Sequence, residues 1–114
     1  KTRNILSREN LLKTRKGVRI INCARGGLID EAALLAALQS GKVAGAGLDV
    51  FEGEPEVHPA LLACNNVVLT PHIGSASVPT RRQMAGLAAE NLIAALTGGT
   101  PPTPVNPRVL PLKL

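Results

Sequence analysis

One arginine follows an apolar segment of this chain at a place where it could bind a small anion. Arg25 follows the β-branched run of residues 18–23 after one alanine and is itself followed by two glycines. A guanidinium there can hold a carboxylate through two parallel hydrogen bonds, and glycines let backbone and ligand approach closely. A merely solvated arginine in a turn would look the same, so Arg25 alone decides nothing.

A histidine and a glutamate could supply acid–base chemistry. His72 follows the short apolar run of residues 67–70, and it could exchange a proton near neutral pH. Glu54, in the loop after the apolar run of residues 43–51, could orient the imidazole and stabilise its charged form. A lone histidine and a glutamate are usually unconnected, so their contact is a hypothesis. The other histidine, His58, lies among acidic residues and is expected on the surface.

A third carboxylate stands out because of its neighbours. Asp49 interrupts the apolar residues 48–51, which are expected in a buried strand. A carboxylate in such a strand needs a hydrogen-bonding partner or a ligand. A salt bridge to an arginine would serve as well as a ligand, so both possibilities stay open for Asp49.

Several other chemistries lack their sequence signatures. Residues 74–77 do not form the G-x-S-x-G turn of serine hydrolases, and the P-loop pattern G-x-x-x-x-G-K-[ST] does not occur. A thiol mechanism is disfavoured because Cys23 is expected in an apolar strand, where a thiolate is unstable. Cys23 and Cys64 show no zinc-binding or disulfide spacing, so no metal is expected. Their spacing fits a reducing compartment, and the cytoplasm is therefore expected.

Alternating strands and helices would have to position these side chains. Such alternation predicts an α/β layer with a parallel sheet and right-handed crossovers. Ligands bind such sheets beyond the carboxyl ends of the strands, and the candidate residues lie at or just after the three expected strand ends. The expected elements are helix 8–15 capped by Ser7, strand 18–23, helix 31–39 capped by Asp30, strand 43–51, a turn at 59–64, strand 67–70, and helix 79–96 capped by Ser77.

Composition narrows the class of protein. The chain has 114 residues, 45% of them hydrophobic and 1% aromatic, so one core built of aliphatic side chains is expected. The net charge is +5, and eight of the 13 basic residues fall in residues 1–25, which indicates an anionic partner. Nucleic acid is disfavoured because stacking aromatics and binding motifs are missing. No apolar run is long enough for a membrane span, and five of the nine prolines predict an extended arm after residue 100.

Three ordered blocks of the sequence form a specific pattern: residues 22–31 (NCARGGLIDE), 47–55 (GLDVFEGEP) and 70–75 (TPHIGS). Together they resemble the D-isomer-specific 2-hydroxyacid dehydrogenase family, and the resemblance covers nearly the whole chain. Within the family, the first two blocks are most similar to D-3-phosphoglycerate dehydrogenases, whereas the ending at residues 102–107 (PTPVNP) is similar to glyoxylate/hydroxypyruvate reductases.

The resemblance implies a role for each candidate residue. Arg25 would bind the carboxylate and carbonyl region of a 2-oxo acid. His72 would protonate the carbonyl oxygen during reduction and act as the base in reverse, and Glu54 would hydrogen-bond it. Asp49 would meet the carboxamide of the nicotinamide of NAD, with NADP not excluded. The other cofactor-binding positions implied are the backbone at Cys23, Ala24 and Arg25 and at His72, Ile73, Gly74 and Ser75.

The sequence departs from the family pattern in one respect. The family's NAD domain opens with a G-x-G-x-x-G turn, but residues 45–50 lack the third glycine and lead into a loop. The resemblance therefore implies a partial doubly wound, Rossmann-like sheet of three strands with crossover helices. Residues 1–74 would be the later half of an NAD-binding domain, and residues 75–114 a long helix and arm returning to a substrate domain.

Two hypotheses of function follow. The first is a fragment of an NAD-dependent oxidoreductase that transfers hydride between nicotinamide and a D-2-hydroxy acid/2-oxo acid pair. The pair would be 3-phosphoglycerate-like or, alternatively, of the glyoxylate/hydroxypyruvate class. The isolated chain would be inactive or very weakly active. The second is a non-catalytic, self-associating α/β module. In both cases a homo-oligomer is expected, because strand 18–23 would expose an unpaired edge and helix 79–96 an apolar face.

Overall fold

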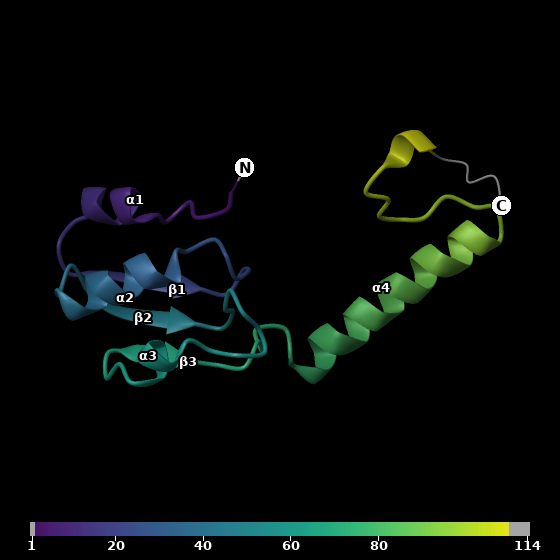
Figure 1. The fold of residues 1–114 in the computed structure, drawn as a ribbon. Coiled ribbons are helices and arrows are strands. Elements are labelled where there is room, and N and C mark those ends of the chain that lie inside the picture. Colours follow the sequence, from purple (N-terminus) through teal and green to yellow (C-terminus); the bar gives the residue numbers. More distant parts are fainter. Residues whose placement is uncertain (1, 110–114) are drawn as a thin grey trace. The chain divides into compact units, whose positions relative to one another are not determined.

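The computed structural model describes residues 2–109, and the chain divides into two compact units, residues 1–74 and 75–114. The first unit is an α/β layer, as predicted (Figure 1). Helix α2 packs against strand β2, and α3 lies beside β3. In chain order its elements are α1 (Arg8–Lys13), β1 (Val18–Asn22), α2 (Glu31–Gln39), β2 (Val43–Leu48), α3 (Pro59–Leu62) and β3 (Val67–Leu69).

The three strands are parallel and lie in the order β1-β2-β3. Their register sets Ile21 opposite Gly47 and Gly47 opposite Val68. Two further backbone hydrogen bonds extend the pairing past the strand ends, from Asp49 N–H to the Asn22 carbonyl and from Thr70 N–H to the Leu48 carbonyl, both 2.9 Å. The carboxyl ends of all three strands therefore meet at one edge.

The core lies on one face of this sheet. Side chains alternate between the two faces of a strand, and Ile20, Ala46 and Leu48 are buried, whereas Ile21 and Val68 on the other face are 79% and 69% exposed. Burial of branched aliphatic side chains is worth about 1.5–3 kcal/mol each, so this face holds the first unit together. The other buried hydrophobic members of this core cluster are Leu11, Ile29, Leu34, Ala37, Leu38, Val43, Phe51 and Leu61.

Local signals predicted two of the three helices of the first unit, whereas α3 was expected only as a turn at 59–64. The carboxylate of Asp30 accepts a hydrogen bond from Ala33 N–H at 2.9 Å, and α2 has its predicted bounds. Helix α1 is shorter than the predicted 8–15 and ends at Lys13. Thr14 is extended there, and both its N–H and its hydroxyl donate to the Leu11 carbonyl, which closes the helix.

The second predicted strand, residues 43–51, is too long. The strand ends at Leu48, and Asp49 N–H makes the last backbone bond to β1; further on, Phe51 N–H donates to the Glu54 carboxylate at 2.9 Å instead of to a neighbouring strand. Cys23 was expected inside an apolar strand, and that expectation is wrong as well. It lies one residue past β1 and is exposed.

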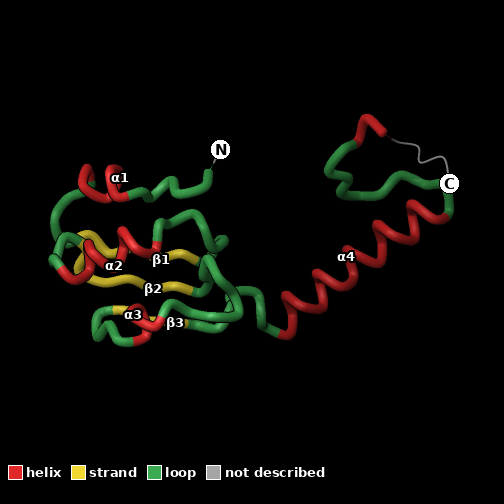
Figure 2. Tube along the Cα trace, viewed as in Figure 1, coloured by secondary structure: helices red, strands yellow, loops and turns green. Residues whose placement is uncertain are grey.

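The second unit contains α4 (Val78–Leu96), which begins one residue before the predicted 79 and is capped by Ser77 as predicted; the Ser77 hydroxyl accepts a hydrogen bond from Thr80 N–H at 3.4 Å. The predicted apolar face is weak, because apolar side chains such as Ile93 also lie on the opposite side of α4, and no residue of α4 is buried in the described part of the chain. The proline-rich segment after the helix (Figure 2) is not simply an extended arm. Thr103 exchanges two hydrogen bonds with the Asn91 side chain, and a short 3-10 helix, η1, spans Pro107–Val109. Pro111 lies outside the described residues.

Candidate active site

His72 and Glu54 are in direct contact at the edge where the strands end. The Nδ1 of His72 lies 2.8 Å from Glu54 Oε2, and the two side chains are 45% and 33% exposed. The His72 hydrogen bond, then that from Phe51 N–H, lowers the pKa of Glu54 below its ordinary value. An ionised carboxylate can only accept, so Nδ1 carries the shared proton. This leaves Nε2 of His72 as the atom that can face a substrate.

The backbone of His72 has an unusual conformation. Its φ is +53°, in the left-handed region that residues other than glycine seldom adopt. Backbone hydrogen bonds hold this turn: His72 N–H donates to the Thr70 carbonyl at 3.0 Å, and the two following N–H groups donate to Asp49. Uncommon backbone conformations that the surroundings enforce are frequent at functional sites.

Asp49 is the side chain that organises this turn. It is 4% exposed and accepts hydrogen bonds from the Thr70 hydroxyl at 2.5 Å, Ile73 N–H at 2.8 Å and Gly74 N–H at 2.7 Å. The Thr70 hydroxyl, followed by the Ile73 N–H, lowers the pKa of the Asp49 carboxyl. Its partners are thus groups at the end of β3, and the arginine considered from the sequence is not among them.

Asn22 fixes the turn that carries Arg25. Its side chain is 8% exposed, donates to the Arg25 carbonyl at 3.0 Å and accepts from Ala24 N–H at 3.1 Å. Sequence reasoning gave Asn22 no role, although a polar side chain at an inward position of an apolar strand is a signal that could have found it. Gly26 is also required, because a Cβ there would lie 1.9 Å from the Phe51 carbonyl oxygen.

Three of the predicted residues line one hollow of about 240 Å³: Arg25, Glu54 and His72. One Arg25 nitrogen, Nη1, donates to the Ala24 carbonyl at 2.6 Å. A neighbouring apolar hollow of about 370 Å³ shares His72 and Glu54 as its polar wall. The first hollow is completed by Arg3, Gly26, Gly27, Phe51 and Glu52, and the second by Phe51, Pro55, Val57 and Pro71.

The remaining predicted positions lie around this edge or next to it in sequence. Cys23 and Ala24 are exposed beside Asn22, and Ile73 and Gly74 are exposed in the turn held by Asp49; Ser75 is the first residue of the second unit. His58 is exposed, as expected, and its Nδ1 accepts from Ala60 N–H at 3.2 Å, which caps α3. Among residues 2–109, no group of His, Cys, Asp and Glu could hold a metal ion. No helix of this described part combines the length and apolar character needed to span a membrane.

A guanidinium and an acid–base pair at the carboxyl edge of a parallel sheet define a ligand-binding α/β protein of the nucleotide-binding type. The family model that matches residues 1–74 is the NAD-binding domain of D-isomer-specific 2-hydroxyacid dehydrogenases. The chain belongs to this family, as the sequence resemblance indicated. The match covers the unit that holds Arg25, Glu54 and His72.

Individual relatives agree with this assignment. A glyoxylate reductase of Pyrococcus horikoshii is 49% identical over 112 residues, which are 98% of this chain and 34% of that protein. The crystal structure of a glyoxylate reductase from Paecilomyes thermophila matches with a TM-score of 0.88 and 47% identity, over 94% of this chain and 33% of the other. A Sinorhizobium meliloti NADPH-dependent glyoxylate/hydroxypyruvate reductase, in complex with NADP and malonate, matches with a TM-score of 0.87 and 48% identity over 91% and 33%.

The chain thus spans about a third of the length of the curated relatives it matches. The similarity of the first two blocks to D-3-phosphoglycerate dehydrogenases is not supported, since these relatives are glyoxylate or glyoxylate/hydroxypyruvate reductases.

Proposed function

We propose that this chain belongs to an NAD(P)-dependent reductase of small 2-oxo acids, with the glyoxylate/hydroxypyruvate class ahead of the 3-phosphoglycerate class. The observation that carries the proposal is the 2.8 Å contact between His72 and Glu54 beside Arg25, at the edge where ligands bind such sheets. The names of the relatives support the substrate class, because they are glyoxylate and glyoxylate/hydroxypyruvate reductases.

In this proposal the three side chains divide the work. Arg25 binds the carboxylate of the oxo acid through its guanidinium, which fits a carboxylate with two parallel hydrogen bonds. His72 donates the proton on Nε2 to the carbonyl oxygen during reduction and removes it in the reverse direction. Glu54 accepts the Nδ1 proton, which holds the ring in place and stabilises the imidazolium before it gives up its proton.

The nicotinamide would lie at Asp49 and the exposed backbone of Cys23, Ala24 and Ile73. Asp49 fits this role because its Oδ2 accepts one hydrogen bond, from Gly74 N–H, and a carboxylate oxygen can accept a second one from an amide. When bound, reduced NAD or NADP supplies the hydride that goes to the carbonyl carbon. Arg25, His72, Gly74 and Ser75 complete the proposed contacts, as the family resemblance implies.

The full-length protein that carries these residues tests the proposal. We expect it to oxidise NADH or NADPH when glyoxylate or hydroxypyruvate is added, with a lower kcat/KM for 3-phosphohydroxypyruvate. The loss of absorbance of the reduced cofactor is the measurement. If neither cofactor is oxidised with any of these acids, the non-catalytic α/β module becomes the better account.

We also propose a division of labour between the two units. Residues 1–74 would form the later half of the NAD-binding domain, and residues 75–114 the helix and arm that lead back to a substrate domain. The end of the family match at residue 74 supports this division. Limited proteolysis of the full-length protein should then cut near residue 75 before it cuts within β1–β3.

Self-association is a further part of the proposal. Among the described strands, β1 is paired on one side only, and Leu92 and Leu96 of α4 are 60% and 65% exposed. Unpaired edges and apolar helix faces are the surfaces through which chains associate. Light scattering over a dilution series of this chain should detect a homo-oligomer, and a monomer at high micromolar concentration would contradict the proposal.

We also propose a reducing compartment, the cytoplasm, for this protein. Both cysteines are free, which supports this proposal.

A further inference from the structure

One backbone segment, at residues 51–52, contacts both the Arg25 turn and Glu54. The Phe51 carbonyl oxygen lies against Gly26, where a Cβ would be 1.9 Å away, so the Arg25 turn packs directly on it. Phe51 N–H donates to Glu54 Oε1 at 2.9 Å, and the other oxygen of Glu54 meets His72. A shift of this segment would therefore move the acid–base pair relative to Arg25.

Glu31 holds this segment from outside the site. Its Oε1 accepts the Glu52 N–H at 2.6 Å, across 21 positions of sequence. Glu31 is half-buried in the first turn of α2, and Leu34, one turn further on, is 0% exposed, so the helix that carries it is anchored in the core. The Glu52 side chain pairs with Arg3, whose side chain is 74% exposed and therefore forms a looser second anchor.

We propose that Glu31 is a positioning residue of the candidate site. Its carboxylate fixes the Glu52 N–H to the core-anchored end of α2, which keeps Glu54 on His72 Nδ1 at a set position relative to Arg25. Glu31 touches neither His72 nor the hollow beside it, and it acts through the hydrogen bond to Glu52 N–H. The inference rests on the proposed function for its kinetic test only, because its structural contacts can be measured separately.

Two conservative variants distinguish the effect of the length of the Glu31 side chain from the effect of its charge. Glu31→Gln keeps an oxygen at the same distance from the backbone but removes the charge, whereas Glu31→Asp keeps the charge and withdraws it by one methylene. In the full-length protein with glyoxylate and reduced cofactor, we expect E31D to lower kcat about tenfold, since small misplacements of reacting groups are costly. We expect E31Q to stay within about twofold of the parent protein. The control is Glu9→Asp, in the first turn of α1, whose carboxylate pairs with the exposed Lys13.

A second measurement does not depend on turnover. The Nδ1 proton of His72, observed by NMR and assigned with His72→Gln, should keep its chemical shift in E31Q and E9D and move or exchange faster in E31D. The inference would be overturned if E31D showed an unchanged kcat and an unchanged His72 proton signal. It would also be overturned if E31Q and E31D lost activity to the same extent. If the parent protein itself shows no turnover, the proposed function fails, and the proton signal alone then decides the role of Glu31.

Discussion

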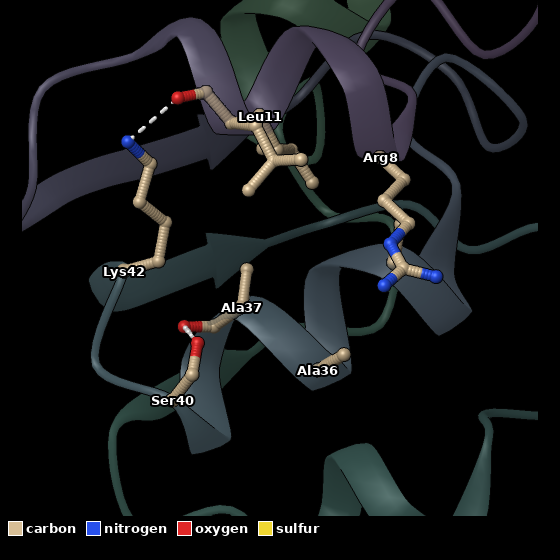
Figure 3. Close-up of a pocket in the computed structure, with 8 residues that line it drawn as sticks. Arg8, Leu11, Ala36, Ala37, Ser40 and Lys42 are labelled. Carbon is tan, nitrogen blue, oxygen red and sulfur yellow. Dashed lines mark hydrogen bonds between the residues drawn. The ribbon is translucent and has the colours of Figure 1, made fainter.

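Two hollows of the first unit have the same volume, about 240 Å³, but differ in what their polar groups do. One of them, the hollow between α1 and α2, is shown in Figure 3. There Lys42 Nζ donates to the Leu12 carbonyl at 2.9 Å and also to that of Thr14, and the Ser40 hydroxyl donates to the Ala37 carbonyl at 3.2 Å. Lys42 and Ser40 thus close the ends of helices, and the rest of the lining is Ala, Leu and one arginine, Arg8, with no carboxylate or histidine among the lining residues.

The other hollow, lined by Arg25, Glu54 and His72, keeps hydrogen-bonding groups that a ligand can use. Glu54 is occupied by His72 and by Phe51 N–H, but this arrangement leaves Nε2 of the imidazole free to face a substrate. The Arg25 side chain has five N–H donors, and one of them donates to the Ala24 carbonyl. The two hollows share a volume and each is lined by an arginine, so the feature that distinguishes the candidate site is the His72–Glu54 pair beside Arg25.

The largest effect is expected at His72. If it is the acid–base group, His72→Ala should lower kcat about 10²- to 10⁴-fold in the full-length protein, because that is the usual contribution of general acid–base catalysis. The matched control is His58→Ala, since His58 caps α3 and does not line the hollow. Steady-state kinetics with glyoxylate measure both. Equal activity of the two variants would remove the distinction between the hollows.

Arg25 should affect substrate capture more than turnover. Arg25→Lys keeps the positive charge but loses the planar fork that fits a carboxylate. Hydrogen bonds to charged groups contribute about 1.5–3 kcal/mol, so KM for the oxo acid should rise about 10- to 100-fold. Arg19→Lys, on the exposed side of β1, is the control and should leave KM unchanged. A KM that does not change in Arg25→Lys would argue that the substrate carboxylate binds elsewhere.

Asp49 links the site to the acid stability of the fold. The pKa of Asp49 is lowered by the Thr70 hydroxyl and the Ile73 N–H, so its stabilising effect is complete above the ordinary value of 3.8 and is lost as the pH falls through the lowered pKa. The pKa of Glu54 is lowered chiefly by the His72 hydrogen bond, so Glu54 also stabilises the fold above its ordinary pKa of 4.5 and loses this effect as the pH falls through the lowered pKa. Thermal unfolding followed between pH 2 and 6 should therefore show a steep loss of Tm in acid.

The variant Asp49→Asn sharpens this prediction. An amide nitrogen cannot accept the hydrogen bond that Gly74 N–H or Ile73 N–H now donates, so the turn carrying His72 should loosen. We expect a lower Tm at neutral pH, a kcat reduced about tenfold by the misplaced His72, and a smaller loss of Tm in acid. An acid transition as steep as that of the parent protein would assign the pH dependence to other carboxylates.

The smallest effect is expected in the hollow between α1 and α2. Lys42→Met removes the ammonium that caps α1 but keeps a long apolar side chain, so the free energy of unfolding should fall by about 0.5–1.5 kcal/mol. The value of kcat/KM should not change, because Lys42 does not line the hollow of Arg25. Urea unfolding and steady-state kinetics of the same preparation measure both quantities. A loss of activity at constant stability would contradict the structural role of Lys42.

The sequence by itself determined the order of the three strands and of α1, α2 and α4, and the edge of the sheet at which the candidate site lies. Residues that cap or end helices, such as Asp30 and Ser77, act on their immediate neighbours, so their roles can be read locally. The apolar runs predicted three parallel strands, and parallel strands place their carboxyl ends at one edge. This is why Arg25, Asp49 and His72 could be expected near one another before any distance was known.

Only the tertiary structure decided which groups these side chains contact. Asp49 accepts from Thr70, Ile73 and Gly74, and Glu31 accepts from Glu52 N–H, across 21 to 25 positions of sequence. Such contacts depend on strand register and on the packing of α2, which no local propensity encodes.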